Sequence, residues 1–322
     1  AKFYREKFPQ IKLIWGNSGG TASIVAMILR NSVDTKLIDF FGLETSAGQT
    51  APPEKLSLLT PQGAWLIQET ARKFGVDKPV TGCYEYTSRC DRNLGPQKQA
   101  QFYARDVLVS QAYGFRNISP AIIYDAGNAY FNTLWGAGGL CRRAPLYYPK
   151  PAYVALAALT NALDQATLKK KMPTGSASVH VLEFDRADGR TAYALWTPRA
   201  EAELGFEFPA DAALELHEFY GDVSNPAPAG GSISLTAGPS PRYLLSTRPA
   251  RSAKVLRQIE EKNPPGFVVA DKLDKASAWS LHEDKSVTKE KGDDLPQVPG
   301  KFTLRQASDP EKGDCFELEL HG

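Results

Sequence analysis

Short apolar runs alternate with helix-like segments over the first half of the chain. The runs at residues 11–15, 36–41, 80–84 and 117–124 have the length and residue types of buried strands. Between these runs, apolar residues recur every three or four positions, most clearly over residues 97–113. This pattern predicts a repeated βα unit, and four such units make half of an eight-stranded barrel.

After residue 163 the pattern changes to short alternating segments separated by turn residues, which is typical of a β-sandwich. Charged residues that end in a proline pair predict a linker, and further β-prone runs follow it. The predicted fold class is therefore α/β plus all-β, in four parts. These are the second half of a (β/α)8 TIM barrel (1–165), a β-sandwich (166–250), a linker (251–265) and the start of a jelly-roll-like, carbohydrate-binding β module (266–322).

Glu85 is the first candidate for a catalytic residue. It follows the apolar run 80–84, so it falls where a strand ends, and barrel enzymes carry their active sites at that end of the strands. Tyr84, Tyr86 and Arg89 lie close to it in the sequence, and hydrogen bonds or opposite charge from such neighbours adjust the pKa of a carboxylate. The position suits a nucleophile that attacks a sugar carbon. The alternative is a solvated loop glutamate.

The order and spacing of several segments resemble the second half of a clan A retaining glycoside hydrolase. This group includes β-xylosidases, α-L-iduronidases, β-galactosidases and endoglucanases. The matching segments are Lys78-Pro79 with the strand to Glu85, the helix from Gln99, the strand from Ser119 to Asp125, the return through Leu134 to Leu140, and Pro149 to Tyr153.

The resemblance implies an O-glycosyl hydrolase that cleaves a poly- or oligosaccharide by double displacement, with Glu85 as nucleophile. It also implies that the acid/base glutamate lies in the first half of the barrel, which this sequence does not contain. That missing N-terminal half is thus an expected partner, supplied by the same precursor or by another chain. The competing class is a non-catalytic carbohydrate-binding or scaffold protein with a degenerate barrel.

Other residues near the predicted strand ends are candidates for substrate binding. Trp15 and Trp135 offer flat faces to sugar rings, with packing as the alternative, and Glu44 either contacts a sugar hydroxyl or is solvated. The full set is Trp15, Asn17, Glu44, Tyr84, Tyr86, Arg89, Tyr124, Asp125 and Trp135.

Composition narrows the choice of function. The net charge of +2 comes without a basic stripe, which argues against nucleic acid, and the lysine-rich run at residues 168–171 is predicted to be the solvated end of a helix. No apolar run has the length of a membrane span. The four histidines lack metal-ligand spacing, so we expect no metal and no other cofactor.

Cysteine positions bear on the compartment of the protein. Cys90 and Cys141 follow adjacent predicted strands, and a disulfide between them would suit a secreted, extracellular or periplasmic enzyme. Two free thiols are the alternative.

Overall fold

The computed structural model describes residues 2–15, 22–31, 34–45, 52–54, 62–84, 94–120, 123–125, 137–259, 301–309 and 313–321. The chain forms two compact units. The first comprises residues up to Ile259 except 175–177, and the second comprises residues 175–177 and 260–322.

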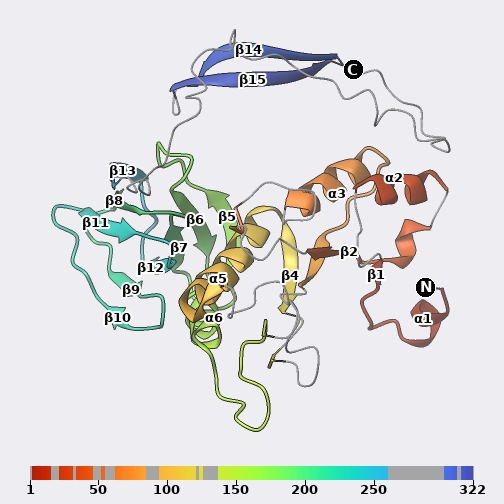
Figure 1. The fold of residues 1–322 in the computed structure, drawn as a ribbon, viewed down its shortest axis with the longest axis horizontal. Coiled ribbons are helices and arrows are strands. Elements are labelled where there is room, and N and C mark those ends of the chain that lie inside the picture. Colours follow the sequence, from red (N-terminus) through yellow and green to blue (C-terminus); the bar gives the residue numbers. More distant parts are fainter. Residues whose placement is uncertain are drawn as a thin grey trace. The chain divides into compact units, whose positions relative to one another are not determined.

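The first half of unit one contains a four-stranded parallel sheet (Figure 1). Its strands lie in chain order: β1 (Ile14–Trp15), β2 (Phe40–Thr45), β3 (Val80–Tyr84) and β4 (Phe115–Pro120). Helices occupy the intervals and the ends: α1 (Lys2–Lys7), α2 (Ala22–Arg30), α3 (Gln62–Arg72), α5 (Pro96–Ala112) and α6 (Pro151–Ala162). The predicted alternation of strand and helix is confirmed in these ranges.

The second predicted strand begins later than expected. Residues Thr35–Leu37 form the short 3-10 helix η1, because the side chain of Asp34 accepts a hydrogen bond from the backbone N–H of Lys36 at 3.1 Å. Such local bonds from aspartate compete with strand pairing. Asp39, just before β2, accepts a bond from Leu13 N at 2.8 Å and pairs with Arg5, which ties α1 to the sheet.

Helices α2 and α3 cover one face of this sheet. Their buried residues Val25 and Ile67 pack with Phe41, Leu43 and Val80 of the strands in one apolar cluster. This cluster explains why the apolar runs of the first half form strands, since both the helices and the sheet bury one apolar side.

Two antiparallel sheets follow α6. The six-stranded sheet has the order β10-β9-β12-β7-β6-β5, and the three-stranded sheet has the order β11-β8-β13. The strands are β5 (Thr167–Lys171), β6 (His180–Asp185), β7 (Thr191–Trp196), β8 (Glu201–Glu207), β9 (Leu214–His217), β10 (Val223–Ser224), β11 (Ser232–Ala237), β12 (Arg242–Ser246) and β13 (Ser252–Ile259).

Both faces of β7 are buried. Ala192, Ala194 and Trp196 pack in a cluster with residues of α5 and α6, whereas Tyr193 and Leu195 pack in a second cluster with residues of β8. The six-stranded sheet is therefore the middle layer between the two helices and the three-stranded sheet. Helices α5 and α6 and the six-stranded sheet share one hydrophobic core within unit one.

Two sequence-based assignments differ from the structure. The predicted linker 251–265 is wrong in its first part, because β13 pairs with β8 along Glu201–Glu207. The lysine-rich run at residues 168–171, predicted as the end of a helix, lies instead in β5 at the edge of the six-stranded sheet. Edge strands of this kind carry charged side chains toward solvent, which hides the strand pattern.

The second unit contains one described hairpin. Strands β14 (Lys301–Asp309) and β15 (Gly313–His321) pair antiparallel over their full length. The sequence predicts a small β module here. Among the described residues this hairpin agrees with that prediction.

Candidate functional site

The C-terminal ends of three parallel strands coincide. Thr45 of β2 lies opposite Tyr84 of β3, and Tyr84 lies opposite Pro120 of β4. In the same register the backbone of Glu44 faces Cys83. The structure thus aligns the strand ends at which the sequence predicts catalytic and binding residues.

Several predicted site residues lie outside the described residues. Glu85 follows Tyr84 directly in the sequence, and Asn17, Tyr86, Arg89, Cys90 and Trp135 are outside as well. For Glu44 and Tyr84 the structure describes the backbone. The assignment of Glu85 as nucleophile and the roles of these neighbours therefore stay predictions.

Trp15 is partly buried at the end of β1. Its ring centroid lies 5.8 Å from that of Phe41, and both residues belong to the apolar cluster beneath α2 and α3. These contacts favour a packing role for Trp15, which was the alternative to stacking on a sugar ring.

Asp125 has no exposed side-chain surface. Its Oδ1 accepts bonds from Lys150 Nζ at 2.5 Å and from the backbone N–H of Gly139 at 3.0 Å, and the side chains of Asp125 and Lys150 are both fully buried. Lys150 Nζ also donates to the carbonyl of Ala137 at 3.0 Å. Asp125 therefore holds the segments after β4 together, and this burial corrects the prediction that its side chain lines a sugar-binding cleft.

Gly139 allows a close approach at the same place. A Cβ atom at this position would collide with the backbone N of Asp125, which no side chain allows without movement of the backbone. From α5, Gln99 Nε2 donates to the carbonyl of Ala137 at 3.2 Å, and the hydroxyl of Tyr103 donates to the carbonyl of Gly138. The helix thus supports the segment that Asp125 and Lys150 fasten.

Tyr124 is exposed, as expected for a substrate-binding residue, and its ring meets that of Tyr147 edge-on with centroids 5.5 Å apart. Sequence reasoning missed Tyr147 and its neighbour Tyr148. The signal was present, because Leu146, Tyr147 and Tyr148 form an apolar run between prolines where a polar loop is usual.

A second buried ion pair connects the barrel-like half to the sandwich. Arg105 of α5 binds both carboxylate oxygens of Glu54, and Trp196 Nε1 donates to Glu54 Oε1 at 2.8 Å. Burial opposes ionisation of Glu54, but the hydrogen bonds and charge of Arg105 outweigh it and hold the pKa of this carboxyl below its usual range. Sequence reasoning did not predict this network, since its three residues come from different segments of the chain.

His180 stacks on the other side of this network. Its ring is nearly parallel to that of Trp196, with centroids 4.8 Å apart. Burial, followed by the charge of Lys171, lowers the pKa of His180 to about 4. His180 is therefore neutral at pH 7 in the folded protein.

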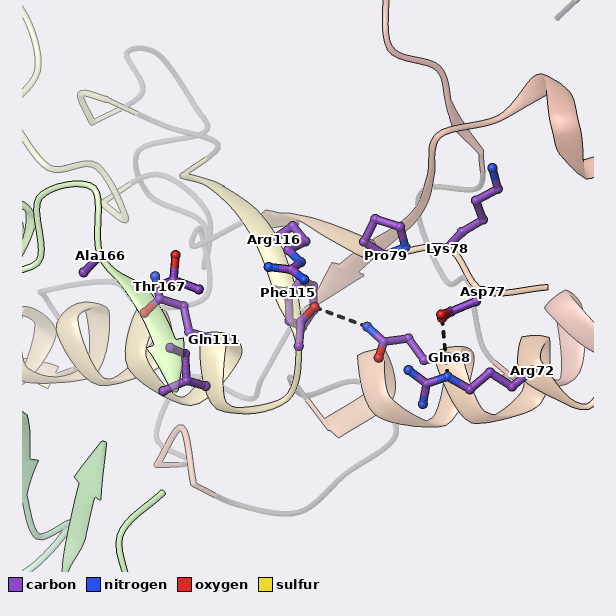
Figure 2. A pocket seen from close by; sticks show the side chains of 12 residues that line it. Gln68, Arg72, Asp77, Lys78, Pro79, Gln111, Phe115, Arg116, Ala166 and Thr167 are labelled. Atoms are coloured by element: carbon purple, nitrogen blue, oxygen red, sulfur yellow. Dashed lines mark hydrogen bonds and ion pairs between the residues drawn. The ribbon is translucent and has the colours of Figure 1, made fainter. Parts of the chain in front are cut away.

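A groove with a volume of about 520 Å³ lies beside α3 and the N-terminal ends of β3 and β4, and Figure 2 shows the side chains that line it. Arg72 Nε donates to Asp77 Oδ1 at 3.4 Å, and Gln68 Nε2 donates to the carbonyl of Gly114 at 3.2 Å. Barrel enzymes react at the C-terminal ends of their strands, so this groove is at the opposite end from the predicted site.

Two other site types are not found in the part of the chain that the structure describes. Its His, Cys, Asp and Glu residues form no group of three or more that could hold a metal ion. Among these same residues, no helix combines the length and the apolar character needed to cross a membrane.

No family model matches the chain, and neither does any curated protein. Solved structures do match. A family 39 glycoside hydrolase from the gut symbiont Bacteroides cellulosilyticus is 19% identical with a TM-score of 0.55, over 75% of this chain and 52% of that one. A GH30 endoxylanase from Clostridium papyrosolvens is 10% identical with a TM-score of 0.53, over 76% of this chain and 57% of that one.

The structural neighbours are thus glycoside hydrolases built on a TIM barrel, and the chain shares their mixed α/β and sheet fold. It spans about half the length of these two structures. The similarity supports the fold that the sequence resemblance implies. At 19% and 10% identity it supports the fold alone and no activity.

Proposed function

We propose that the chain is the C-terminal half of a clan A-like retaining glycoside hydrolase that cleaves a poly- or oligosaccharide. The observation that carries this proposal is the common register of Thr45, Tyr84 and Pro120, because it brings three strand ends to one edge and Glu85 comes immediately after the middle one. The glycoside hydrolase fold of the solved neighbours supports the same function.

The proposed reaction uses two carboxyl groups about 5 Å apart. The Glu85 carboxylate attacks the anomeric carbon while the bond to the leaving oxygen breaks, and a second glutamate gives that oxygen a proton. A glycosyl ester on Glu85 results. The second glutamate then takes a proton from water, whose oxygen attacks the anomeric carbon and releases Glu85. This chemistry requires no metal and no organic cofactor.

The second glutamate would come from the first half of the barrel. Among the described residues, β1 pairs with β2 alone and β4 pairs with β3 alone, so both outer strands have an open edge. Closed barrels pair every strand, and open parallel edges expose backbone groups that need partners. The proposed partner is therefore the N-terminal half barrel, in the same precursor or in another chain.

An apolar groove beside β4 supports this partner. It has a volume of about 460 Å³ and lies between α5, β4 and α6. Its apolar lining residues are Val107, Ile118, Leu156, Leu159 and Leu163. Leu159 and Leu163 are already buried, whereas Val107, Ile118 and Leu156 are only partly buried and would be covered by an added strand and helix. Sequencing beyond both ends of the isolated protein, together with its intact mass, tests whether such a segment accompanies the chain.

Covalent labelling tests the nucleophile. The protein, with its barrel partner where one is found, is treated with activated 2-deoxy-2-fluoro glycosides of several sugars, digested and mapped by mass spectrometry. We expect a label on Glu85 and none on the Glu85→Gln variant, whose turnover falls by several orders of magnitude. Glu69→Gln is the matched control, because Glu69 is an exposed acid on α3. A label on Glu44, or full activity of Glu85→Gln, refutes the assignment. The absence of both a label and turnover with all of these sugars favours a non-catalytic carbohydrate-binding protein.

A further inference from the structure

Five large side chains gather on the segments that follow β4. Ile123, Tyr124, Leu146, Tyr147 and Tyr148 are each more than half exposed, and we call them the tyrosine platform. Residues 137–150 form the yellow-green loop at the lower edge of Figure 1. Contiguous exposed apolar surface of this kind marks a binding site more often than a scattered apolar residue does.

The platform has a fixed base. Cys141 N donates to the carbonyl of Ile123 at 2.8 Å, Asp125 N donates to that of Cys141 at 2.9 Å, and Arg142 N donates to that of Tyr148 at 2.9 Å. Below these bonds lies the buried pair of Asp125 and Lys150. These backbone hydrogen bonds and the buried ion pair therefore fix the backbone that carries the five exposed side chains.

Tyr147 has an unusual backbone conformation. Its φ of 45° is in the left-handed region, which residues with a side chain adopt rarely and which concentrates at functional sites. In this conformation its ring meets Tyr124 edge-on, with an angle of 79° between the planes. The two rings thus come from two different segments, 123–125 and 137–150, which the backbone hydrogen bonds of Cys141 join.

The platform follows the strand end that is in register with β3. Tyr124 is four residues beyond Pro120, and an extended chain of that length spans at most about 14 Å. Pro120 lies opposite Tyr84, the residue before Glu85. Tyr124 is therefore within reach of a carbohydrate chain bound at that strand end.

Residue chemistry indicates the ligand. Tyrosine combines a flat apolar ring with a polar hydroxyl, which matches the C–H faces and hydroxyl groups of a sugar. The accessible charged residues of the loop 137–150 are Arg142 and Arg143, which can donate hydrogen bonds to sugar hydroxyl groups, because Lys150 is buried with Asp125. We propose that the tyrosine platform is a subsite that binds further sugar units of a chain whose bond is cleaved at Glu85. This inference rests on the proposed function and narrows its substrate to an oligomer.

Binding measurements test the subsite without requiring turnover. The full protein is titrated by calorimetry with xylan, cellulose, β-glucan and galactan oligosaccharides of about six units, a length that spans several subsites. For the oligosaccharide that binds, we expect Tyr124→Ala combined with Tyr147→Ala to weaken the affinity about ten-fold or more. Tyr147→Phe should keep most of the affinity, because the ring remains. Tyr147→Gly is a second variant that tolerates positive φ without strain.

Tyr4→Ala is the matched control. Tyr4 is also more than half exposed, and its ring meets Phe3 edge-on at 5.5 Å, but it lies on α1. Its loss should leave the affinity unchanged. Circular dichroism and thermal unfolding show that each variant is folded.

The outcomes separate this inference from the proposed function. Normal oligosaccharide affinity in the double alanine variant overturns the subsite, even where Glu85→Gln abolishes turnover. Weakened affinity in a protein that hydrolyses nothing even with its barrel partner present supports sugar binding by the platform and contradicts the proposed function. Absence of oligosaccharide binding by the parent protein also overturns the subsite, as does a dimer that the tyrosine substitutions dissociate without any effect on sugar affinity.

Discussion

Arg105 and Glu54 form a bidentate ion pair, with Nε and Nη2 of the guanidinium each 2.7 Å from a carboxylate oxygen. Arg105 is 1% exposed, and Trp196 of the sandwich donates to the same carboxylate. One acidic side chain thus connects α5, the segment after β2 and the six-stranded sheet.

Glu54→Gln should destabilise the protein by about 3–5 kcal/mol, because it leaves the buried Arg105 charge without its partner. Denaturant unfolding followed by circular dichroism measures the change. The control is Glu69→Gln, which breaks the exposed pair of Glu69 with Arg72 and should cost about 1 kcal/mol or less. Equal effects of the two substitutions would contradict a structural role for the Glu54 pair.

Lys150→Met should lower the free energy of unfolding by as much as Glu54→Gln does, because the buried Asp125 then loses its counter-charge. The double variant Asp125→Leu with Lys150→Met should recover part of the loss, since it removes both charges. Chemical denaturation of the two single variants and the double variant forms a complete cycle. Arg248→Met is the control, because Arg248 pairs with Asp211 at the surface. A double variant less stable than both single variants would contradict this prediction, because the two losses would then accumulate instead of cancelling.

His180 should make the stability of the protein depend on pH between about 4 and 6.5. The unfolded chain binds a proton at His180 near pH 6.5, whereas burial and Lys171 lower the pKa in the folded state to about 4. The unfolded state therefore holds more protons in this window, and stability falls as the pH falls. The loss reaches about 3 kcal/mol at pH 4.

His180→Phe keeps a ring against Trp196 and removes the titration, so its stability should vary less with pH across the same window. Urea unfolding at several pH values measures both slopes, and the difference between them isolates His180 from the carboxyl groups. Titration of His180 near pH 6.5 in the NMR spectrum of the folded protein would disprove the prediction.

Cys90 and Cys141 should form a disulfide in the freshly isolated protein. Cys141 is partly exposed and has no disulfide partner among the described residues, and Cys90 lies outside them. Peptide mapping without reducing agent should find the two joined, in keeping with the proposed secreted, extracellular or periplasmic location. Recovery of both as free thiols removes this support for an oxidising compartment.

Elements with a strong internal pattern could be predicted from the sequence. β3 matches the apolar run 80–84, and α5 matches the three- and four-residue spacing, because each buries one continuous set of side chains. β5 and β13 could not be predicted, because their outer positions are charged and because the partner of β13, β8, lies far earlier in the chain. Pairing with neighbouring strands decides the structure of such segments.

The candidate site divides in the same way. The place of Glu85 after a strand follows from local sequence, since β3 ends at Tyr84. The burial of Asp125 does not, because its partner Lys150 is 25 residues away and nothing local marks the pair. The segment that carries Tyr147 resembles an ordinary loop until its bonds to residues 123–125 are known.

The burial of β7 on both faces bears on how this architecture can change over evolutionary time. Alternate residues of the strand contact the helices and the second sheet, so each substitution must satisfy two surroundings at once. A recombination event that moved the six-stranded sheet to another protein would expose this strand unless α5 and α6 moved with it. We therefore expect the two helices and the antiparallel sheets to be inherited together.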